Sequence, residues 1–451
     1  MELDELFEKV VLLLEKGDYQ SLRALLDEQE PYDLACLCEE LSEGSLPIVF
    51  RIMSRDTAAE CFSEMSADVQ ESLIRRLTDA ELRAVLNELY IDDTVDIIEE
   101  MPANVATRIL ANSDPTSREQ INRILKYPKD SAGSIMTVEY VRLDKNMSVA
   151  DAFARIRRVG TDKETIYTCY VTDSDRTLVG VVTAMDLMLN DMDTLISEIM
   201  ETNVISATTD EDRESVVLKF SNYDFLALPV VDKGNRLVGI VTVDDAFDVA
   251  LEEATEDVEK MAAITPTDKP YIKTGVFSTW LSRIPWLMIL MLSSTFTGII
   301  ISHYELALSN CIILTSFIPM LMGTAGNAGG QTSVTIIRAL SLGDVETGDI
   351  LKILWKEFRV ALLCGVSLAA VGYIKAVTID GADPYEALAV CLTLALTVIA
   401  AKIVGCCFPM LIKKIGFDPA VVASPFITTV VDVLALFVYF AVATAVIPSL
   451  N

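Results

Sequence analysis

Oxygen-bearing side chains interrupt an apolar stretch near the end of the 451-residue sequence, and their spacing suits a cation site. Asp432 lies within PFITTVVDVLALFVYF, and Thr428 precedes it by one helical turn on the same face. Ser424 adds a further hydroxyl. A charge at the centre of a bilayer costs about 2.5 to 3.5 kcal/mol, so Asp432 is expected to face protein or water. The stripe indicates an ion site, while a helix-packing hydrogen bond or an ion pair with Lys402 remains open.

A second polar segment, PMLMGTAGNAGGQTS at residues 319–333, directly follows an apolar run. Its glycines permit either an unwound backbone or a very close helix contact. Irregular backbone at membrane depth occurs only where it is buried in protein or lines a wet cavity. Asn327 and Gln331 would then offer amide oxygens to an ion or to its water shell. A plain helix-packing seam of small residues is the alternative.

Acidic side chains are concentrated in the first 270 residues. Residues 271–451 carry ten acidic and ten basic side chains, so the whole formal charge of −30 lies in residues 1–270. Such a surface attracts cations and repels nucleic acid, which is therefore not an expected partner. A solvated surface or a salt-adapted organism would give the same composition. Acids also crowd one predicted helix, residues 242–264, where bound cations would relieve the repulsion; a solvated linker helix is the alternative.

Residues suited to enzymatic catalysis are scarce. His303 is the one histidine, so neither a Ser-His-Asp nor a Cys-His arrangement is evident. GNAGGQ lacks the GK[ST] ending of a phosphate-binding loop. The nine cysteines show no CxxC pair and suit a reduced cytoplasm. The start, MELDELFEKVVLLLEKGD, is an acidic amphipathic helix and not a signal peptide. We therefore expect no enzyme, and targeting by the later apolar segments.

Five apolar runs are close to the length of about 20 residues that a membrane span needs. They lie near 284–302, 306–322, 360–379, 387–412 and 420–447. Lys and Arg precede the first run and occupy the loops after the second and fourth, whereas the other two loops are acidic and carry none. Because basic loops favour the cytoplasmic side, the sequence predicts a cytoplasmic N-terminal half and an external Asn451.

An internal repeat occupies residues 136–252. IYTCYVTDSDRTLVGVVTAMDLM matches DFLALPVVDKGNRLVGIVTVDDAF. Each copy predicts a strand, a helix and a β-β-α element, which resembles a tandem pair of CBS (cystathionine-β-synthase-type) domains. Such pairs often hold adenine nucleotides, and Thr183, Asp186 and Thr242 stand where ribose-binding side chains would. Residues 1–128 show apolar i, i+3, i+4 spacing and predict an array of short helices.

Together, the acidic helical domain, the CBS pair, the acidic connecting helix and five spans containing GNAGGQ and DPAVVASPFITTVVD resemble the MgtE magnesium channels over essentially the whole chain. The resemblance implies a multidomain protein with an all-α helical N-terminal domain, an α/β tandem CBS pair and an all-α five-helix transmembrane domain. The implied boundaries are 1–130, 131–199, 200–247, 248–270 (the plug helix) and 271–451. It also implies a homodimer in the lipid of the inner (plasma) membrane.

The resemblance further assigns roles to side chains. Asp432 matches the aspartate that holds a hydrated magnesium ion in a pore between two subunits, and Asp418 in GFDPA matches a pore-entrance position, although it could equally cap a helix. Magnesium bound to cytoplasmic acids is implied to close the channel. The matching positions are Glu60, Asp92, Asp96, Asp212, Glu214, Asp224, Asp245, Glu253, Glu256 and Asp257.

Two departures from the family pattern affect these expectations. Lys402 stands in the fourth span where a neutral residue is expected, and we expect it to reach the interface or to pair. Met185 stands where some members have an arginine suited to nucleotide phosphates, which weakens the expectation of ATP at the CBS pair.

The main interpretation is therefore a passive, magnesium-gated channel that conducts Mg²⁺. One alternative is an ion-coupled secondary transporter of divalent cations such as cobalt or manganese. Another is a membrane-anchored metal or nucleotide sensor that transports nothing.

Overall fold

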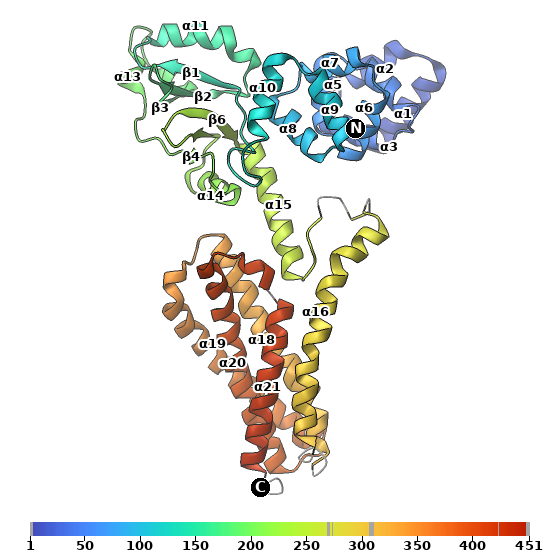
Figure 1. The fold of residues 1–451 in the computed structure, drawn as a ribbon, viewed down its shortest axis with the longest axis vertical. Helices are drawn as coiled ribbons and strands as arrows, with labels where there is room; N and C mark the ends of the chain where they lie inside the picture. Colours follow the sequence, from blue (N-terminus) through green and yellow to red (C-terminus); the bar gives the residue numbers. More distant parts are fainter. Residues whose placement is uncertain (1–2, 268–270, 273, 306–310, 423, 448–451) are drawn as a thin grey trace. The chain divides into compact units, whose positions relative to one another are not determined.

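The computed structural model describes residues 3–267, 271–272, 274–305, 311–422 and 424–447. These residues form two units, Met1–Ala250 and Leu251–Asn451 (Figure 1). The first unit contains a helical domain and two small mixed sheets, and the second contains long helices. The predicted multidomain class is confirmed.

Short helices build the N-terminal domain of the first unit. They are α1 Leu3–Lys16, α2 Tyr19–Leu26, α3 Pro31–Glu40, α4 Leu46–Ile52, α5 Arg55–Ser63, α6 Ala67–Arg76, α7 Asp79–Leu86, α8 Ile91–Glu100, α9 Ala103–Asn112 and α10 Pro115–Ile124. Each is too short to be stable alone in water. Their apolar faces supply most of one continuous core, in which Leu22, Leu34, Leu73 and Ile109 are fully buried.

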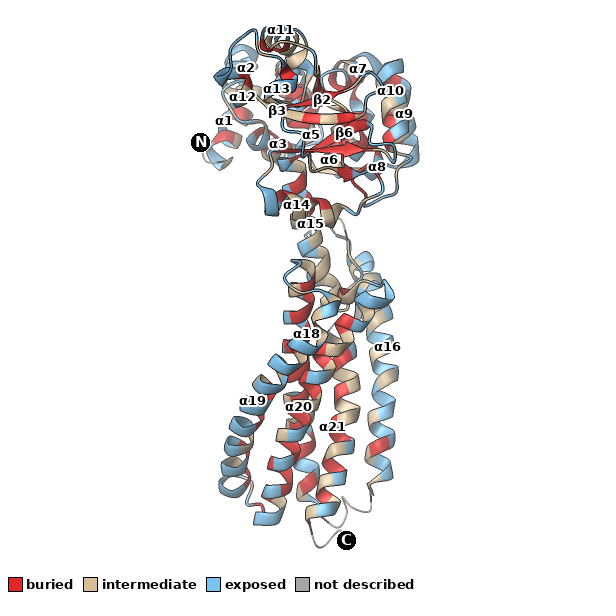
Figure 2. Cartoon of the chain, turned by 90° about the vertical axis from the view of Figure 1, so that its left-hand side faces the viewer, coloured by how far each residue is buried: buried red, intermediate tan, exposed pale blue. Residues whose placement is uncertain are grey.

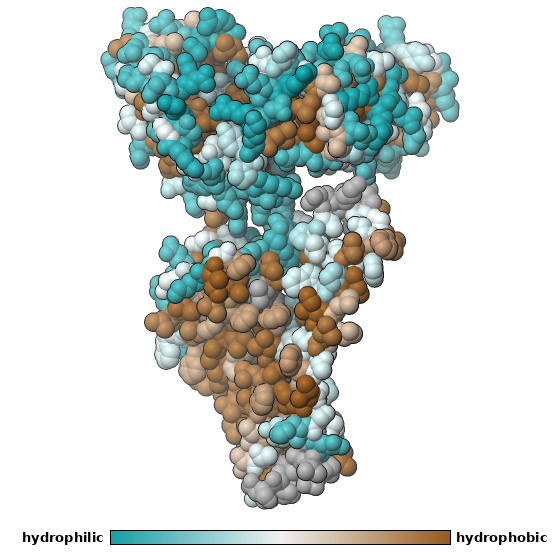
Figure 3. All heavy atoms as spheres, viewed as in Figure 1, coloured by the Kyte–Doolittle hydropathy of each residue, from teal (hydrophilic) through white to brown (hydrophobic). Residues whose placement is uncertain are grey.

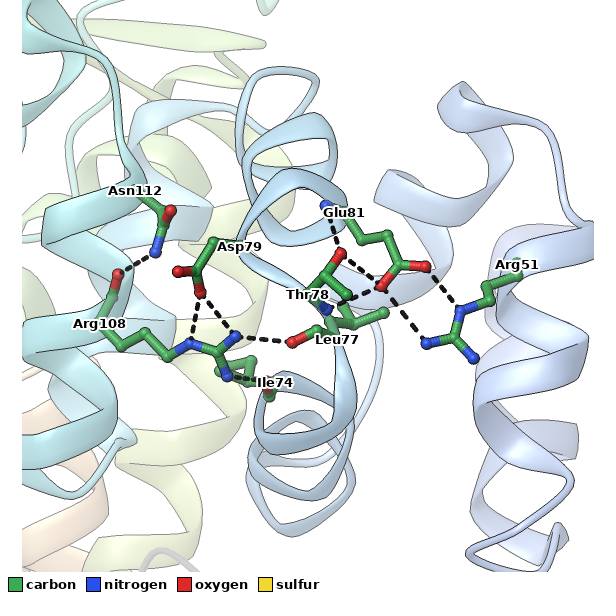
Figure 4. Close-up of polar contacts among 8 residues, drawn as sticks. All are labelled: Arg51, Ile74, Leu77, Thr78, Asp79, Glu81, Arg108 and Asn112. Atoms are coloured by element: carbon green, nitrogen blue, oxygen red, sulfur yellow. Dashed lines mark hydrogen bonds and ion pairs between the residues drawn. The ribbon is translucent and has the colours of Figure 1, made fainter.

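Polar contacts at the helix ends fix the order of this array (Figure 4). Arg108 of α9 donates to the backbone oxygens of Ile74 and Leu77, at 2.5 and 2.6 Å, and so satisfies carbonyl groups at the C-terminal end of α6. Arg51 of α4 donates from Nε to Oε1 of Glu81 in α7, at 2.7 Å. Side chains far apart in the sequence therefore join successive layers of helices.

Two copies of the same sheet follow the helical domain. The first has β1 Tyr140–Asp144, β2 Thr165–Thr172 and β3 Leu178–Thr183, with α11 Val149–Val159, α12 Ala184–Leu189 and α13 Ile196–Ile199. The second has β4 Ala207–Thr208, β5 Ala227–Val231 and β6 Leu237–Thr242, with α14 Arg213–Tyr223 and α15 Val243–Met261. In each sheet the first two strands are parallel and the last two antiparallel.

The repeated LVG motif occupies the same place in both copies. It opens β3 and β6, and its glycine pairs with Val171 in the first sheet and with Val230 in the second. A Cβ atom on Gly239 would lie 2.6 Å from the backbone oxygen of Thr137, and one on Gly180 would lie 2.7 Å from the sulfur of Met200. Glycine is therefore required because another segment crosses each strand at this point.

The second unit is built from long helices, α16 Val276–His303, α18 Ile313–Ser341, α19 Ile350–Thr378, α20 Pro384–Ile415 and α21 Ser424–Val446. Apolar side chains cover much of the face of these helices that is visible in Figure 3. Buried residues concentrate on α18, α20 and α21, whereas α16 is exposed along most of its length (Figure 2). Asp383 caps α20 with Glu386 in a capping box, and Gly416 ends that helix at a φ of 91°.

Four of these helices, within the described residues, are long and apolar enough to cross a membrane: α16, α19 with the preceding turn, α20 and α21. The predicted span at 306–322 differs from the structure. Its first five residues lie outside the described residues, and the part from Ile313 onward belongs to α18, whose polar glycine-rich half lowers its hydropathy. Length and composition therefore support four spans, and α18 is a fifth long helix of mixed character.

Candidate functional site

The glycine-rich segment forms a close helix contact and remains helical throughout α18. A Cβ on Gly405 of α20 would lie 2.3 Å from the backbone oxygen of Gly329, and a Cβ on Gly326 would lie 2.9 Å from Cγ2 of Thr428 in α21. The structure thus decides between the two readings of these glycines. They bring α18 against α20 and α21, and the backbone is not unwound.

One face of α18 stays open and lines a groove of about 510 Å³. The lining residues are Gly326, Asn327, Gly330, Gln331, Val334, Thr335 and Thr428. Asn327 and Gln331 are exposed to this groove, one helical turn apart. Amide and hydroxyl oxygens of this kind can accept hydrogen bonds from the water shell of a cation. The structure therefore brings together three of the predicted pore residues.

Asp432 lies one turn beyond Thr428 on α21, outside the lining of the groove. Its Oδ1 atom is buried and has no hydrogen-bond partner within the described residues. The predicted alternative of a pair with Lys402 is wrong, since Lys402 contacts Glu357 and Thr332 instead. A carboxylate oxygen left without a partner in a membrane-spanning helix marks a position where a cation or water would be stabilised.

Ser424, the remaining predicted pore residue of α21, begins that helix, and its side chain lies outside the described residues.

A lysine and three acids meet where the C-terminal end of α15 contacts the long helices. The Lys260 ammonium lies 2.8 Å from Oδ2 of Asp418 and 2.5 Å from Oε1 of Glu256. Ser341 of α18 donates to Oδ2 of Asp257 at 3.2 Å. Burial lowers the pKa of Lys260, but the hydrogen bonds to Asp418 and Glu256 outweigh that effect, so the net shift is upward. Two of the predicted regulatory acids, Glu256 and Asp257, are therefore engaged here.

Asp418 has two partners at once. Its Oδ1 accepts from the backbone N–H of Ala420, 2.8 Å away, which caps the short 3₁₀ turn η3 Pro419–Val422. Its Oδ2 binds Lys260. The capping alternative is thus present in the structure, and the Lys260 ammonium occupies the second oxygen.

A cluster of carboxylates lies within the first unit, between α8, the two segments next to β1 and β2, and the start of α15. Asp92 is 8% exposed, and its Oδ1 has no partner within the described residues. The Oε2 atom of Glu164 is also buried and has no hydrogen-bond partner within the described residues. Glu139 accepts from the N–H of Ile91 at 3.0 Å, and Asp245 accepts from the hydroxyl of Thr242 at 2.5 Å.

These carboxylates raise one another's pKa values. Burial and then the charge of Asp245 hold the pKa of Asp92 well above its usual range. The same two causes raise the pKa of Asp93 to about 7 and that of Glu164 to about 8. Burial, opposed by the Thr242 hydroxyl, raises the pKa of Asp245 to about 6. The cluster is therefore a region of strong negative potential that protons or another cation would stabilise.

The remaining predicted regulatory acids are not all in this cluster. Asp212 caps the start of α14 by accepting from the N–H of Glu214, and Asp224 ends that helix in the left-handed conformation. Glu60 is exposed on α5, and Asp96 is exposed on α8. Glu253 belongs to α15 within the second unit. Within the described residues, no three acidic, cysteine or histidine side chains form a ready coordination shell.

The predicted nucleotide residues bond to each other. The hydroxyl of Thr183 donates to Asp186 at 2.6 Å in a capping box at the start of α12. Thr242 and Asp245 form the corresponding pair in the second copy. Met185 is 66% exposed beside the first pair. These contacts fix the strand-to-helix turns, and a ribose would have to compete with them.

Sequence reasoning missed several participants. Asp93 directly follows Asp92 in IDDTVD and could have been found from that doublet. Glu139 and Glu164 join the cluster only because parallel pairing places Tyr140 opposite Thr165. Lys260 and Glu357 were missed because their partners lie far away in the sequence, 158 residues in the case of Lys260.

The groove, the unpartnered carboxylate of Asp432 and the acidic CBS-containing unit define a membrane protein that handles cations. Models of three families match the chain. The divalent cation transporter model MgtE covers residues 318–442, the MgtE intracellular N domain covers 29–130, and the CBS domain covers 132–192 and 196–252.

Full-length relatives define the family further. The chain is 37% identical to the magnesium transporter MgtE of Thermus thermophilus, over 95% of this chain and 96% of that protein. It is 33% identical to that of Bacillus subtilis, over 100% of this chain and 99% of that protein. The chain therefore belongs to the MgtE family of magnesium transporters.

Two solved structures resemble a little over half of the chain. The cytosolic domain of the Mg²⁺ channel MgtE in complex with ATP is 37% identical, covers 54% of this chain and 99% of its own, and has a TM-score of 0.52. The soluble part of a magnesium transporter is 31% identical, covers 56% of this chain and 100% of its own, and has a TM-score of 0.53.

Proposed function

We propose that the protein is a homodimeric channel that conducts hydrated Mg²⁺ across the inner (plasma) membrane, with its N-terminal half in the cytoplasm. The observation that carries the proposal is the unpartnered Oδ1 of Asp432, one helical turn from a groove lined with amide and hydroxyl oxygens. Magnesium gives up its water reluctantly and is usually held by one or two carboxylates with waters retained. Two copies of Asp432 across a twofold axis would supply that arrangement.

Each groove residue has a defined part in this proposal. Asn327, Gln331 and Thr428 would bind the water shell of the ion on its way to Asp432, with Ser424 at the start of α21. Asp418 would attract the ion at the cytoplasmic entrance, where it would exchange its present contact with the Lys260 ammonium for the ion. No group in this path needs to move a proton or form a bond, which fits a passive pore.

Cytoplasmic magnesium would regulate the channel through the acidic residues of the first unit and of α15. One or two of the clustered carboxylates Asp92, Asp93, Glu164 and Asp245 would hold one regulatory ion with retained waters, because burial and mutual repulsion make their ionised forms unfavourable without a cation. Ions that bind the closed state more tightly shift the channel towards it. The other matching positions, Glu60, Asp96, Asp212, Glu214, Asp224, Glu253, Glu256 and Asp257, would bind further ions.

ATP is a second candidate ligand, at the CBS pair. The support is that a solved cytosolic domain of an MgtE channel is described in complex with ATP. Thr183, Asp186 and Thr242 would then exchange their present hydrogen bonds for bonds to a ribose.

Magnesium flux into proteoliposomes tests the proposal. Purified protein in lipid should pass Mg²⁺ without a proton or sodium gradient, and Asp432→Ala should abolish the flux. A requirement for a second ion would favour a coupled transporter, and flux that Asp432→Ala leaves unchanged would remove Asp432 from the pathway. Ligand binding without flux would favour a sensor.

A further inference from the structure

A charged network lies inside the helix bundle, on a face of α18 that does not line the groove. The Lys402 ammonium of α20 donates to the hydroxyl of Thr332 at 3.0 Å and contacts Oε2 of Glu357 in α19 at 3.4 Å. Thr332 in turn donates to the same Glu357 oxygen at 3.1 Å. The Lys402 side chain is 8% exposed and that of Glu357 is 13% exposed. Three helices are thus joined through one carboxylate oxygen.

The network contacts the same helix that presents the groove. Thr332 follows Gln331 directly, so its side chain points about 100° away around the helix axis. Asn327 and Gln331 face the groove, while Thr332 is buried towards α19 and α20. Any rotation of α18 that moved Asn327 and Gln331 out of the groove would also break the contacts of Thr332.

In the segment that lines the groove, small residues make the α18 contact, while large apolar side chains such as Phe317, Leu321 and Ile337 are buried on either side of it. Gly326, Gly329 and Gly405 let the backbones approach closely, but they have no side chains that interlock. A helix contact made of small residues constrains rotation less than one made of large side chains. A buried polar group, by contrast, has one arrangement that satisfies its hydrogen bonds. Buried polar residues are known to fix register in this way in coiled coils.

We propose that Lys402 is a positioning residue that holds α18 in the rotation at which Asn327 and Gln331 line the ion pathway. It acts through Thr332 and Glu357 and does not contact the ion. The inference rests on the proposed magnesium conduction. It also gives a function to a lysine that would oppose cation flow if it faced the pore.

Charge-removing and bond-removing variants separate positioning from stability. Lys402→Met leaves Glu357 buried without a counter-ion, and we expect magnesium flux to fall at least tenfold. Adding Glu357→Gln removes that charge and keeps an amide that can bond to Thr332, so flux should recover to within about threefold of wild type.

The decisive variant is the apolar triple Lys402→Met, Glu357→Leu, Thr332→Val. A buried ion pair replaced by apolar side chains often leaves a protein as stable as before. We therefore expect normal yield and melting temperature but a loss of selectivity, measured as a several-fold rise in Co²⁺ flux relative to Mg²⁺ flux.

The matched control is Lys375→Met, because Lys375 pairs with Asp380 at 2.7 Å near the other end of α19 and lies outside the groove lining. This variant should conduct and select as wild type does. Wild-type flux and selectivity in the triple variant would overturn the positioning role. The positioning role would also be overturned if a proton gradient drove wild-type flux and Lys402→Met abolished that flux, because Lys402 would then be a proton relay. Absence of flux in wild type would instead defeat the proposed conduction itself.

Discussion

The carboxylate cluster of the first unit should make its stability fall as pH rises when no divalent cation is present. Asp93 has an ordinary pKa of 3.8 and a folded-state pKa of about 7, and Glu164 has values of 4.5 and about 8. Both are raised on folding, so the folded state binds protons that the unfolded state has already released. The stability that these two groups contribute is complete below about pH 4, declines as pH rises above that value, and is fully lost once pH passes the folded-state pKa of about 8.

The size of the effect follows from these two shifts. One pKa unit corresponds to about 1.4 kcal/mol. Between about pH 6 and about pH 8.5, deprotonation would cost about 1.4 kcal/mol at Asp93 and about 2.5 kcal/mol at Glu164 if the two acted independently. Because Glu164 is partly exposed and the charges interact, we expect about 2 kcal/mol in total. Magnesium at about 100 times its Kd would restore about 2.7 kcal/mol.

Urea unfolding of a polypeptide of residues 1–264 would measure this. Midpoints should be compared at both pH values, in EDTA and in excess Mg²⁺, with unchanged m-values. Asp93→Asn should remove about a third of the pH dependence and weaken the magnesium effect, while Glu119→Gln, at an exposed position on α10, should change neither. Stability in EDTA that is flat or rises over this range would refute the assignment of these carboxylates as a cation-dependent cluster.

Further predictions concern the second unit and the CBS pair. Lys260→Met should lower the free energy of unfolding by about 1 kcal/mol and speed protease cleavage within residues 251–275, because it leaves Asp418 and Glu256 without their shared ammonium group. The control Lys352→Met should change neither, since the Lys352 side chain is 85% exposed. Gly405→Ala should lower the yield of folded protein in detergent, since the added methyl would meet a backbone oxygen and overpacking costs about 1 to 3 kcal/mol. Gly239→Ala should lower the melting temperature of residues 1–264 for the same reason, and an unchanged value would show that Thr137 can move aside.

The parts of the fold that local patterns determine could be predicted from the sequence. The two LVG strands, the helical N-terminal array and the acidic helix before the membrane unit were all found, because each depends on the periodicity or turn chemistry of one segment. α18 was the exception. Its glycine-rich half interrupts the apolar pattern while the helix continues, since close packing against α20 compensates for the weak helix propensity of glycine.

The pairing of charges could not be predicted, and this limits what any list of acidic residues can say about a cation site. Lys260 and Lys402 each bind an acid that only the tertiary fold brings near, and each thereby withdraws a carboxylate from the set available to magnesium. Asp92, Glu164 and Asp432 differ from those carboxylates because each retains a buried oxygen without a partner within the described residues. Since a buried charge without a counter-ion is unfavourable, these three carboxylates, two in the first unit and one in the second, are the positions where a mobile cation has most to stabilise.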